Sequence, residues 1–588
     1  MAGISRTARE SDTFPWSLTP HGSMTPPLAE ARRAFLAHCS ALGLGATLFP
    51  GVLWAKVAAG EEITDATIAA AAEVAGVDFT DEERAQMLEG VKRQAAQVQV
   101  LHGVPLENGI APAIQFNPLP RPDALPRGPQ RAVTMSRQSV RTAPADATEL
   151  AYAPLTTLAE LVRRRAVTSE QLTTLYLDRL ERFDAQLFCV VSLLRDRALA
   201  KARAADAEIA RGAYRGPLHG IPWGAKDLLA VVGAPTTWGA APYREQRFDT
   251  DATVVQRLDA AGAVLIAKLT LGELALGDRW FGGMTRNPWK LDQGSSGSSA
   301  GSASATAAGA VGFAIGSETL GSISSPSTRC GVTGLRPTFG RVPRTGAMAL
   351  SWSMDKLGPL ARSAEDCALI FAALHGPDGR DLTTLAAPFN WDGDASIAGI
   401  RVGYVQAAFE APGARRYAAF DTAALEALRG LGVTLRPVTL PELPYDAMRL
   451  ILDAEAGAAF DELTRSGRVR ELAGQSPNSW PTTFRRAHLI PAVDYINANR
   501  LRTVAIHAWD RLMQDVDVIV APTSSSQLLA TNLTGHPALI MPHGFRPEDG
   551  TPLSITFLGQ LFGEEKLLKL GQAFQRVTTH HLRHPALG

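Results

Sequence analysis

The chain has 588 residues, of which 46% are hydrophobic and 20% are charged, a composition typical of globular proteins with a large buried core. The 58 Lys and Arg balance the 58 Asp and Glu, so the formal net charge is zero. Because nucleic-acid binding requires positive charge to neutralise phosphates, this balance argues against a nucleic-acid partner. The 4 cysteines form no CxxC pair, so neither a disulfide framework nor a metal site is predicted.

The N-terminal region offers two interpretations. Residues 1–25 are rich in proline and are predicted to be disordered. A mostly apolar stretch at residues 41–55 follows Arg32 and Arg33. It is too short to span a bilayer, but its length and the twin arginines fit a twin-arginine export signal. A helix packed on the main domain would have a similar composition, so a cytoplasmic and an exported protein both remain open.

A helical segment is predicted next. Ile68 and Ala72 recur at a helical spacing, and residues 80–83 (TDEE) have the form of a capping box, which starts a further helix. Prolines recur between residues 112 and 126 and indicate an extended connector. Residues 26–145 are therefore predicted to form a helical appendage with a proline-rich connector.

From residue 146 onward, helical segments alternate with short strand-like runs. This alternation predicts one α/β domain over residues 146–588, with helices on the faces of a sheet. No linker rich in proline or charge interrupts it. The predicted strands are LFCVVSLL from Leu187, AVLIA from Ala263, VGFAI from Val311, IRVGYV from Ile400 and VDVIVAP from Val516.

A tract rich in serine and glycine, residues 294–337, surrounds the run VGFAI. A flexible linker would stay polar throughout, whereas here residues 303–310 have helical character and VGFAI has the pattern of a buried strand. Ser295–Ser299 would therefore precede a helix, and Ser317 and Ser322 would follow a strand. Serines at the ends of packed elements are typical of a functional site.

Hydrolysis of an amide without a metal requires a nucleophile, a base that deprotonates it and donors for the oxyanion. The tract supplies serines, but no histidine occurs between His219 and His375. Lys226, in the upstream segment GIPWGAKD, is the nearest plausible base. Lys268, at the end of the predicted strand AVLIA, is the competing lysine.

Residues 297–301 also match the pattern GxSxG, which leaves a second alternative. In an α/β-hydrolase, Ser299 would be the nucleophile and a distant histidine the base. We disfavour this alternative because that motif directly follows a strand, and the preceding residues 287–293 (NPWKLDQ) do not have the pattern of one.

A series of short motifs extends along the α/β domain. They are GIP and KD within residues 220–227, RNPW at 286–289, GSS at 297–299, GSI at 321–323, CGVTGLRP at 330–337, DKLGP at 355–359, APT at 521–523 and NLTG at 532–535. In type and order they resemble those of the amidase signature family, from about residue 150 to the C-terminus. The resemblance implies a large mixed central sheet covered by helices on both faces, with the N-terminal helical appendage outside it.

The resemblance implies a hydrolase that cleaves an amide carbon–nitrogen bond through an acyl-enzyme, with no metal or organic cofactor. The family's Ser–cis-Ser–Lys triad falls on Ser322, Ser298 and Lys226. By this resemblance an uncharged Lys226 accepts a proton from Ser298, which takes one from Ser322 as it attacks the carbonyl. A cis peptide bond before Ser298 is also implied.

Two further requirements accompany the triad. For Lys226 to act near neutral pH, its pKa must fall by roughly three units, which implies burial beside hydroxyls. Asp227 must then point away from it. The implied oxyanion donors are the backbone N–H groups of Thr319, Leu320, Gly321 and Ser322.

Four positions depart from the family pattern and leave the substrate class open. Ala300-Gly301 replaces a glycine pair, Glu318 takes the acidic position before the nucleophile, and Ser324 replaces an arginine. Leu320 replaces a glycine, and its Cβ restricts φ and narrows the space for the acyl group. An apolar or aromatic acyl pocket is suggested by the aromatic residues near the motifs, Trp223, Trp238, Trp280 and Phe281.

The expected partner is a small-molecule amide, such as an aryl or acyl amide, with esters and carbamates as chemical alternatives. No stable membrane span is expected, and a homodimer remains open. Two other hypotheses are an ammonia-releasing amidotransferase subunit, which uses glutamine and needs a partner, and an inactive scaffold. The intact triad argues against the scaffold.

Overall fold

The computed structural model describes residues 63–75, 79–102, 107–137, 140, 142–411, 415–523 and 525–587. The chain forms two compact units that divide between Gly103 and Val104, earlier in the sequence than the expected domain boundary at residues 145 and 146. Residues 1–25, the apolar stretch and the twin arginines Arg32 and Arg33 lie outside the described residues.

The described part of the first unit contains the two helices α3 (Asp65–Ala75) and α4 (Asp81–His102). Ile68 and Ala95 are buried in its small core. The predicted capping box begins α4, because the N–H of Thr80 donates to Oε2 of Glu83 and the N–H of Glu83 donates to Oγ1 of Thr80. The two helices predicted for this part of the sequence are therefore present.

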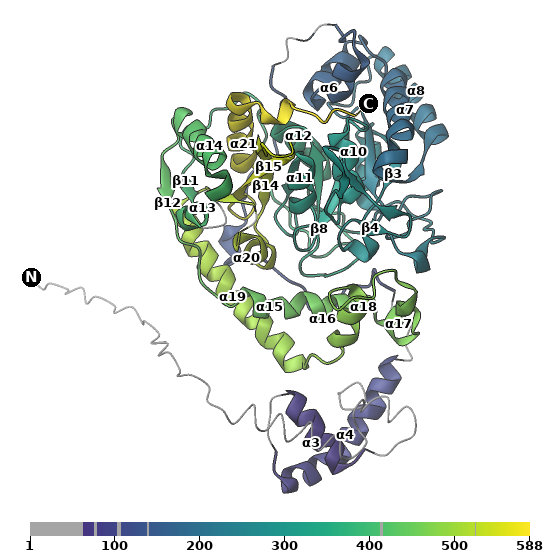
Figure 1. Ribbon diagram of the computed structural model, residues 1–588, viewed down its shortest axis with the longest axis vertical. Helices are drawn as coiled ribbons and strands as arrows, with labels where there is room; N and C mark the ends of the chain where they lie inside the picture. The colour runs from purple at the N-terminus through teal and green to yellow at the C-terminus, as the bar shows by residue number, and fades with distance from the viewer. Residues whose placement is uncertain are drawn as a thin grey trace, which may run out of the picture. The chain divides into compact units, whose positions relative to one another are not determined.

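The second unit is built on a mixed sheet of 11 strands (Figure 1), as the sequence predicted. Its order is β1-β3-β2-β8-β10-β9-β14-β15-β13-β11-β12; β3, β2 and β8 are parallel, β13, β11 and β12 are parallel, and the other neighbours are antiparallel. The strands are β1 (Val190–Leu193), β2 (Pro222–Lys226), β3 (Val264–Leu269), β8 (Phe313–Glu318), β9 (Thr333–Arg336), β10 (Lys356–Ala361), β11 (Val402–Tyr404), β12 (Leu435–Pro437), β13 (Val518–Pro522), β14 (Ala538–Phe545) and β15 (Pro552–Gly559).

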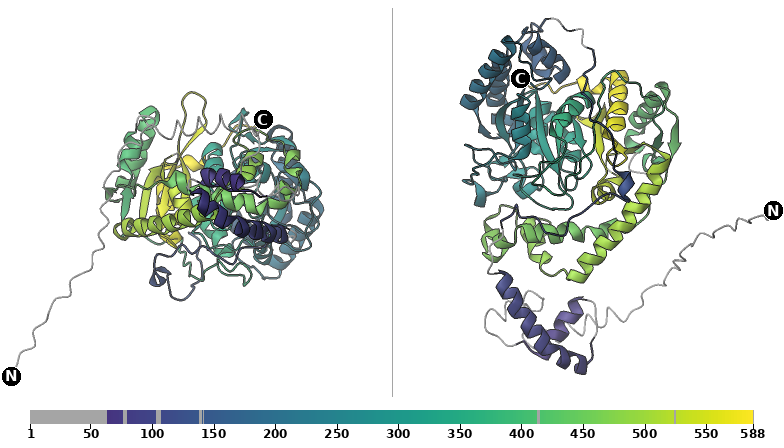
Figure 2. Two further views of the ribbon diagram at one scale, coloured as in Figure 1. Left: turned by 90° about the horizontal axis from the view of Figure 1, so that it is seen from below. Right: turned by 180° about the vertical axis from the view of Figure 1, so that it is seen from behind.

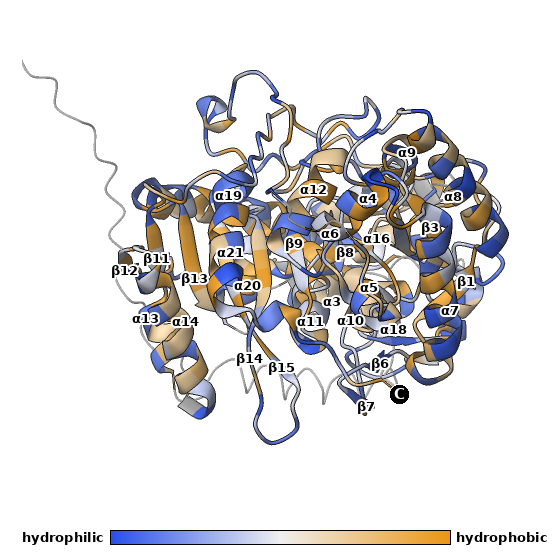
Figure 3. Cartoon of the chain, turned by 90° about the horizontal axis from the view of Figure 1, so that it is seen from above, coloured by the Kyte–Doolittle hydropathy of each residue, from blue (hydrophilic) through white to orange (hydrophobic). Residues whose placement is uncertain are grey.

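Helices pack against both faces of this sheet, and strands such as β13 are strongly apolar (Figure 3). Successive side chains of a strand point to opposite faces. In β10, Leu360 packs with Ala303 and Ile323, whereas its neighbour Ala361 belongs to the main core. The helices are α5 (Ala147–Tyr152), α6 (Leu155–Arg163), α7 (Ser169–Leu187), α8 (Arg195–Ala210), α9 (Thr253–Ala260), α10 (Ala300–Ala307), α11 (Ser324–Cys330), α12 (Ala364–Leu374), α13 (Gln406–Glu410), α14 (Ala418–Gly430), α15 (Tyr445–Met448), α16 (Leu450–Ala459), α17 (Asp461–Arg465), α18 (Trp480–Ala487), α19 (Ala492–Asp515), α20 (Gln527–Thr534) and α21 (Glu564–Thr578).

The helices α15 to α19 gather on one side of the sheet, where α16 packs against α18 and α19 (Figure 2). Short 3-10 turns connect other elements, at Pro122–Ala124, Ala241–Tyr243, Glu273–Ala275, Arg415–Tyr417, Arg468–Glu471 and His580–Leu582. Within the described ranges, every helix is too short or too polar to cross a bilayer.

Each of the five predicted strands is confirmed, as β1, β3, β8, β11 and β13. The helix predicted at residues 303–310 instead spans Ala300–Ala307, because the chain turns at Gly309, whose φ is 61°. The expectation that residues 287–293 contain no strand is wrong. Short strands β6 (Arg286–Asn287) and β7 (Lys290–Gly294) form a separate hairpin there, and β4 (Arg279–Trp280) and β5 (Gly283–Met284) form another.

Candidate active site

Lys226 is the last residue of β2, which lies between the parallel strands β3 and β8 in the interior of the sheet. The side chain is fully buried. Its Nζ lies 2.8 Å from Oγ of Ser298, 2.8 Å from Oγ of Ser317 and 3.1 Å from Oγ of Ser299. Within the described residues Lys226 forms no ion pair, so hydroxyl groups surround the amine.

Burial lowers the pKa of Lys226 well below its ordinary value. The charges of Asp355 and Glu318 act in the opposite direction, but desolvation of the ammonium form is the larger effect. The amine is therefore poised to be uncharged, as the resemblance required.

Ser298 lies just before α10, and the peptide bond between Gly297 and Ser298 is cis, as expected. Position 297 requires glycine because the backbone of Gly277 passes very close to it. A Cβ at position 297 would lie 1.8 Å from the carbonyl oxygen of Gly277. Any side chain there would displace the backbone that presents Ser298 to Lys226.

Ser322 lies in the loop between β8 and α11 and is 8% exposed. The N–H of Ser299 donates to its carbonyl oxygen over 3.0 Å, which joins this loop to the start of α10. Gly321 has a φ of 91°, a left-handed conformation that favours glycine. Among the described residues, the N–H groups of residues 319–322 have no hydrogen-bond acceptor.

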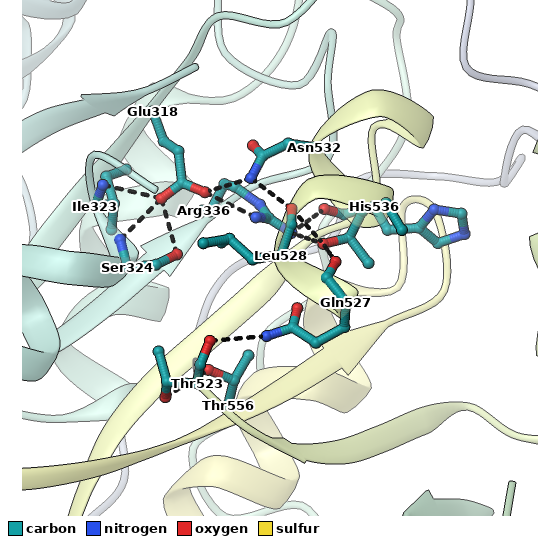
Figure 4. A network of polar contacts seen from close by, with 12 residues as sticks. Glu318, Ile323, Ser324, Arg336, Thr523, Gln527, Leu528, Asn532, His536 and Thr556 are labelled. Carbon is teal, nitrogen blue, oxygen red and sulfur yellow. Dashed lines mark hydrogen bonds and ion pairs between the residues drawn. The ribbon is translucent and has the colours of Figure 1, made fainter. Parts of the chain in front are cut away.

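Glu318, the last residue of β8, braces this loop from inside the protein (Figure 4). Its Oε2 accepts hydrogen bonds from the N–H of Ile323 over 2.9 Å and from the N–H and Oγ of Ser324, both over 2.8 Å. Its Oε1 lies 2.7 Å from Nη1 of Arg336 and accepts from Nδ2 of Asn532 over 2.8 Å. The carboxylate therefore ties β8 to the first turn of α11.

The residues around Glu318 stabilise its ionised form. Burial alone would raise its pKa, but Arg336, Lys356 and Asn532 together outweigh this effect and the pKa falls to about 2. Arg336 is fixed in turn, since its Nη2 donates to Oγ1 of Thr531 over 2.7 Å and to the carbonyl oxygen of His536 over 3.0 Å (Figure 4). The loop that carries Ser322 is thus held by a buried ion pair.

Asp227 points away from Lys226, as expected. One oxygen lies 2.5 Å from Nζ of Lys268, and the other accepts hydrogen bonds from the N–H and Oγ1 of Thr237. Lys268 also donates to Oγ1 of Thr236 over 2.8 Å. The structure therefore places Lys268, the competing lysine, in a buried ion pair and not among the serines.

Ser299, the nucleophile of the α/β-hydrolase alternative, has its hydroxyl on the backbone of the neighbouring strand. It donates to the carbonyl oxygen of Ser317 and accepts from the N–H of the same residue, both over 3.1 Å. Among the described residues, its hydroxyl has no histidine partner. Although β7 precedes it, that strand belongs to a separate hairpin and ends at Gly294, so no strand of the main sheet leads directly into residues 297–301.

A cavity of about 330 Å³ opens beside Ser317 and Thr319. Oγ1 of Thr319 donates to Oδ1 of Asp355 over 2.6 Å, and burial raises the pKa of this carboxyl. The cavity wall combines apolar and polar side chains, among them Leu228, Ala275, Met348, Leu350, Leu357, Arg344, Trp352, Asp355 and Asp381.

The four aromatic residues expected near an acyl pocket do not border this cavity. Trp223 instead stacks on Phe313 in the core, and Trp280 packs edge-to-face on Phe281. The contact between Ser317 and Lys226 was also not predicted from the sequence. Arg336, Asp355 and Asn532 stand inside the quoted motifs, so their positions were marked in the sequence even though their contacts were not.

The second unit thus combines a large mixed sheet with a buried lysine among serines. The family model described as Amidase matches residues 171–530. The chain therefore belongs to the amidase family and is an amide-hydrolysing enzyme.

Relatives and solved structures agree with this assignment. The chain is 33% identical to a glutamyl-tRNA(Gln) amidotransferase subunit of Moorella thermoacetica, over 75% of this chain and 99% of the relative. It is 35% identical to a Mycobacterium tuberculosis (strain H37Rv) protein named as the amidase AmiD, over 73% and 95% of the two chains. The structure of native peptide amidase from Stenotrophomonas maltophilia matches 74% of this chain and 98% of that chain, with 29% identity and a TM-score of 0.65.

Proposed function

We propose that the chain hydrolyses amides through an acyl-enzyme on Ser322, with Ser298 as the relay and Lys226 as the base. The observation that carries this proposal is the fully buried amine of Lys226, 2.8 Å from the hydroxyl of Ser298 and without an ion pair among the described residues. A hydroxyl is a weak nucleophile unless a neighbouring base accepts its proton.

The reaction proceeds in two halves. Oγ of Ser322 forms a bond to the carbonyl carbon while its proton passes to Ser298 and the proton of Ser298 passes to Lys226. The carbon–nitrogen bond then breaks, and the leaving nitrogen takes a proton back from Lys226 along the same path. In the second half, water attacks the acyl carbon and passes a proton through Ser298 to Lys226. The ester bond to Oγ of Ser322 then breaks, and this oxygen takes the proton back along the same path, which releases the acid and regenerates Ser322.

The proposed oxyanion donors are the backbone N–H groups of Thr319, Leu320, Gly321 and Ser322. Two observations support them: these groups have no acceptor among the described residues, and the loop is tied down by Glu318. Preorganised donors of this kind stabilise the developing negative charge because they need not reorient during the reaction.

The proposed substrate is an amide with an aryl or alkyl substituent. The cavity beside Ser317 and Thr319 has apolar wall residues, including Met348, Leu350 and Leu357. Cavities of roughly 300–1,000 Å³ with a few fixed polar groups are typical of small-molecule sites. Esters and carbamates with the same substituent would fit the same chemistry.

The proposal is tested by hydrolysis of a panel of aryl, alkyl and peptide amides. We expect Ser322→Ala to abolish turnover of every substrate in the panel. Ser325→Ala, in the first turn of α11, is the matched control and should retain activity within about 3-fold, because substitutions away from buried networks usually have small effects. Turnover by Ser322→Ala at the wild-type rate would reject Ser322 as the nucleophile.

A second candidate function is the release of ammonia from glutamine, as part of an amidotransferase. The 33% identity to the amidotransferase subunit of Moorella thermoacetica, over 99% of that relative, favours it. Glutamine hydrolysis that appears only when partner subunits are added would support this candidate, whereas hydrolysis of simple amides by the isolated chain would support the amidase. The homodimer remains a prediction, tested by light scattering on the purified protein.

A further inference from the structure

Residues 107–117 form an irregular segment, with a turn at residues 108–109, that lies outside the residues matched by the family model. The side chain of Asn108 fixes the N-terminal end of this segment. The Nδ2 of Asn108 donates to the carbonyl oxygens of Ala349 over 2.8 Å and Ala459 over 3.2 Å, and its Oδ1 accepts from the N–H of Ala349 over 2.8 Å. One side chain therefore joins the segment both to the loop before β10 and to the end of α16.

Phe116 fastens the other end of the segment. The guanidinium of Arg502, on α19, lies 3.4 Å from the centroid of its ring, and the ring of Phe339 packs on its edge with centroids 5.0 Å apart. Arg502 is itself fixed, because it donates to the Oγ and the carbonyl oxygen of Ser353, both over 2.7 Å. The segment is thus held at both ends by contacts of defined geometry.

Between these two attachments the segment borders the cavity at the proposed active site. Gly109, Ala111 and Gln115 line the same cavity as Ser317 and Thr319. Ala111 and Gln115 also border an adjacent hollow of about 510 Å³ on the side of α19. The segment therefore stands between the active-site cavity and a second space into which a longer substituent would otherwise extend.

We propose that residues 107–117 form a specificity-determining wall, which limits the size of the aryl or alkyl substituent that the cavity accepts. This inference rests on the proposed function, since it assigns a substrate group to the cavity beside Ser317 and Thr319, and Ser317 contacts Lys226. The wall touches the substituent and not the reacting atoms, so it should change the choice of substrate and leave the chemistry of Ser322 intact.

The first test fills the cavity from this wall. A Cβ at Gly109 meets no atom within 4 Å, so Gly109→Trp adds bulk without a backbone clash. The matched control is Gly430→Trp, at an exposed glycine at the end of α14 that also has no atom within 4 Å of a Cβ. We expect Gly109→Trp to reduce kcat/KM for the largest amides of the panel by about 20-fold or more, within the range known for apolar pockets.

The same variant should leave the smallest amides and the rate of Ser322 labelling by a small fluorophosphonate within about 2-fold of wild type, because neither reaches the wall. A second variant, Asn108→Ala, loosens the wall without adding bulk. It should lower the KM of amides with the largest substituents by about 5-fold while kcat for small amides is unchanged, because a wall without the three hydrogen bonds of Asn108 limits the substituent less.

The outcomes separate this inference from the proposed function. If wild type hydrolyses amides and Ser322 is labelled, but both Gly109→Trp and Asn108→Ala match Gly430→Trp for all substrates, the wall is wrong and the proposed function stands. If Ser322 is not labelled and no amide is hydrolysed, both are wrong. A loss with large amides alone in Gly109→Trp, or a gain with large amides alone in Asn108→Ala, supports the wall.

Discussion

At the scale of single residues, the amine of Lys226 is buried away from water and contacts serine hydroxyl groups instead. Its protonated form would be buried without an ion-pair partner among the described residues, a costly arrangement unless the group gives up its proton. The neutral amine can instead share hydrogen bonds with Ser298 and Ser317, each 2.8 Å away. Burial and local polarity thus select the form of the side chain that accepts a proton.

The pH dependence of kcat/KM follows from this lowered pKa. The neutral fraction of Lys226 falls as pH falls, so we expect a plateau at alkaline pH and a tenfold decrease per pH unit below the pKa of Lys226. The break should lie well below 10.5, the ordinary lysine value. Initial rates with an anilide between about pH 5 and pH 10 measure it; a break near 10 would show that Lys226 titrates like an ordinary exposed amine.

Substitution of the proposed relay, Ser298, or the proposed base, Lys226, should reduce kcat more than substitution of their neighbour Ser317. We expect Lys226→Met and Ser298→Ala to reduce kcat by about 10³-fold or more, because triad members act as a unit. Ser317→Ala removes a contact to Lys226 but no member of the triad, so a loss of about 10-fold is expected. The measurement is steady-state hydrolysis of one amide by the three variants.

A different ranking would change the assignment. Ser317→Ala with a loss as large as that of Ser298→Ala would make Ser317 the relay. Lys226→Met with a mild loss would exclude it as the base.

At the scale of elements, the site depends on how β8, its following loop and α11 are joined. Glu318 ends the strand and accepts three hydrogen bonds from the first residues of the helix region. Arg336 of β9 and Asn532 of α20 hold the same carboxylate from the other side. Residues of β8, α11, β9 and α20 therefore meet at one carboxylate, which fixes the start of α11 relative to β8.

Glu318→Gln tests the role of this carboxylate in joining the four elements. The neutral amide leaves Arg336 buried without its counter-charge, so we expect the free energy of unfolding to fall by about 3–5 kcal/mol. The pKa of Glu318 in the folded state is lowered to about 2. Its contribution to the free energy of unfolding is therefore present above roughly pH 4.5 and is lost as pH falls towards 2. Urea unfolding at pH 7 and at pH 3 measures both effects.

The control is Glu426→Gln, at an exposed glutamate of α14. It should change the free energy of unfolding by less than about 0.5 kcal/mol, as surface substitutions usually do. Equal stability of Glu318→Gln and Glu426→Gln at pH 7 would contradict the structural role of Glu318.

The elements that sequence predicted best are those with continuous apolar runs, such as β13, which a buried strand requires. The strand that carries Lys226 was not predicted, because PWGAK contains proline and glycine and no apolar run, although all five residues are buried. Motif order predicted Lys226, Ser298 and Ser322, and the contact of Lys226 with Ser298 is confirmed. It did not predict Ser317, whose contact with Lys226 arises from the pairing of β2 with β8. The wall at residues 107–117 has no pattern of its own, since tertiary contacts of Asn108 and Phe116 fix it.

At the scale of the whole molecule, the proposed catalytic residues and the cavity beside them belong to the second unit. That unit contains the complete sheet and the main core. The first unit has its own small core around Ile68 and Ala95. The division indicates that the chemistry is contained within residues 104–588.

Removal of residues 1–103 tests this division. We expect a chain of residues 104–588 to fold and to retain kcat/KM for small amides within about 3-fold of the full chain, because domains with their own core are independent units. Circular dichroism and steady-state rates measure the two properties. A folded chain with more than tenfold lower kcat/KM would show that the first unit contributes to catalysis.

The central claim is that the oxygen at position 322 is acylated during turnover. Peptide mass spectrometry of the full chain after reaction with a fluorophosphonate tests it most directly, with Ser322→Ala in parallel. We expect one phosphonylated residue, Ser322, and no label in the variant. Label on Ser298 or Ser299, or undiminished labelling of Ser322→Ala, would contradict it.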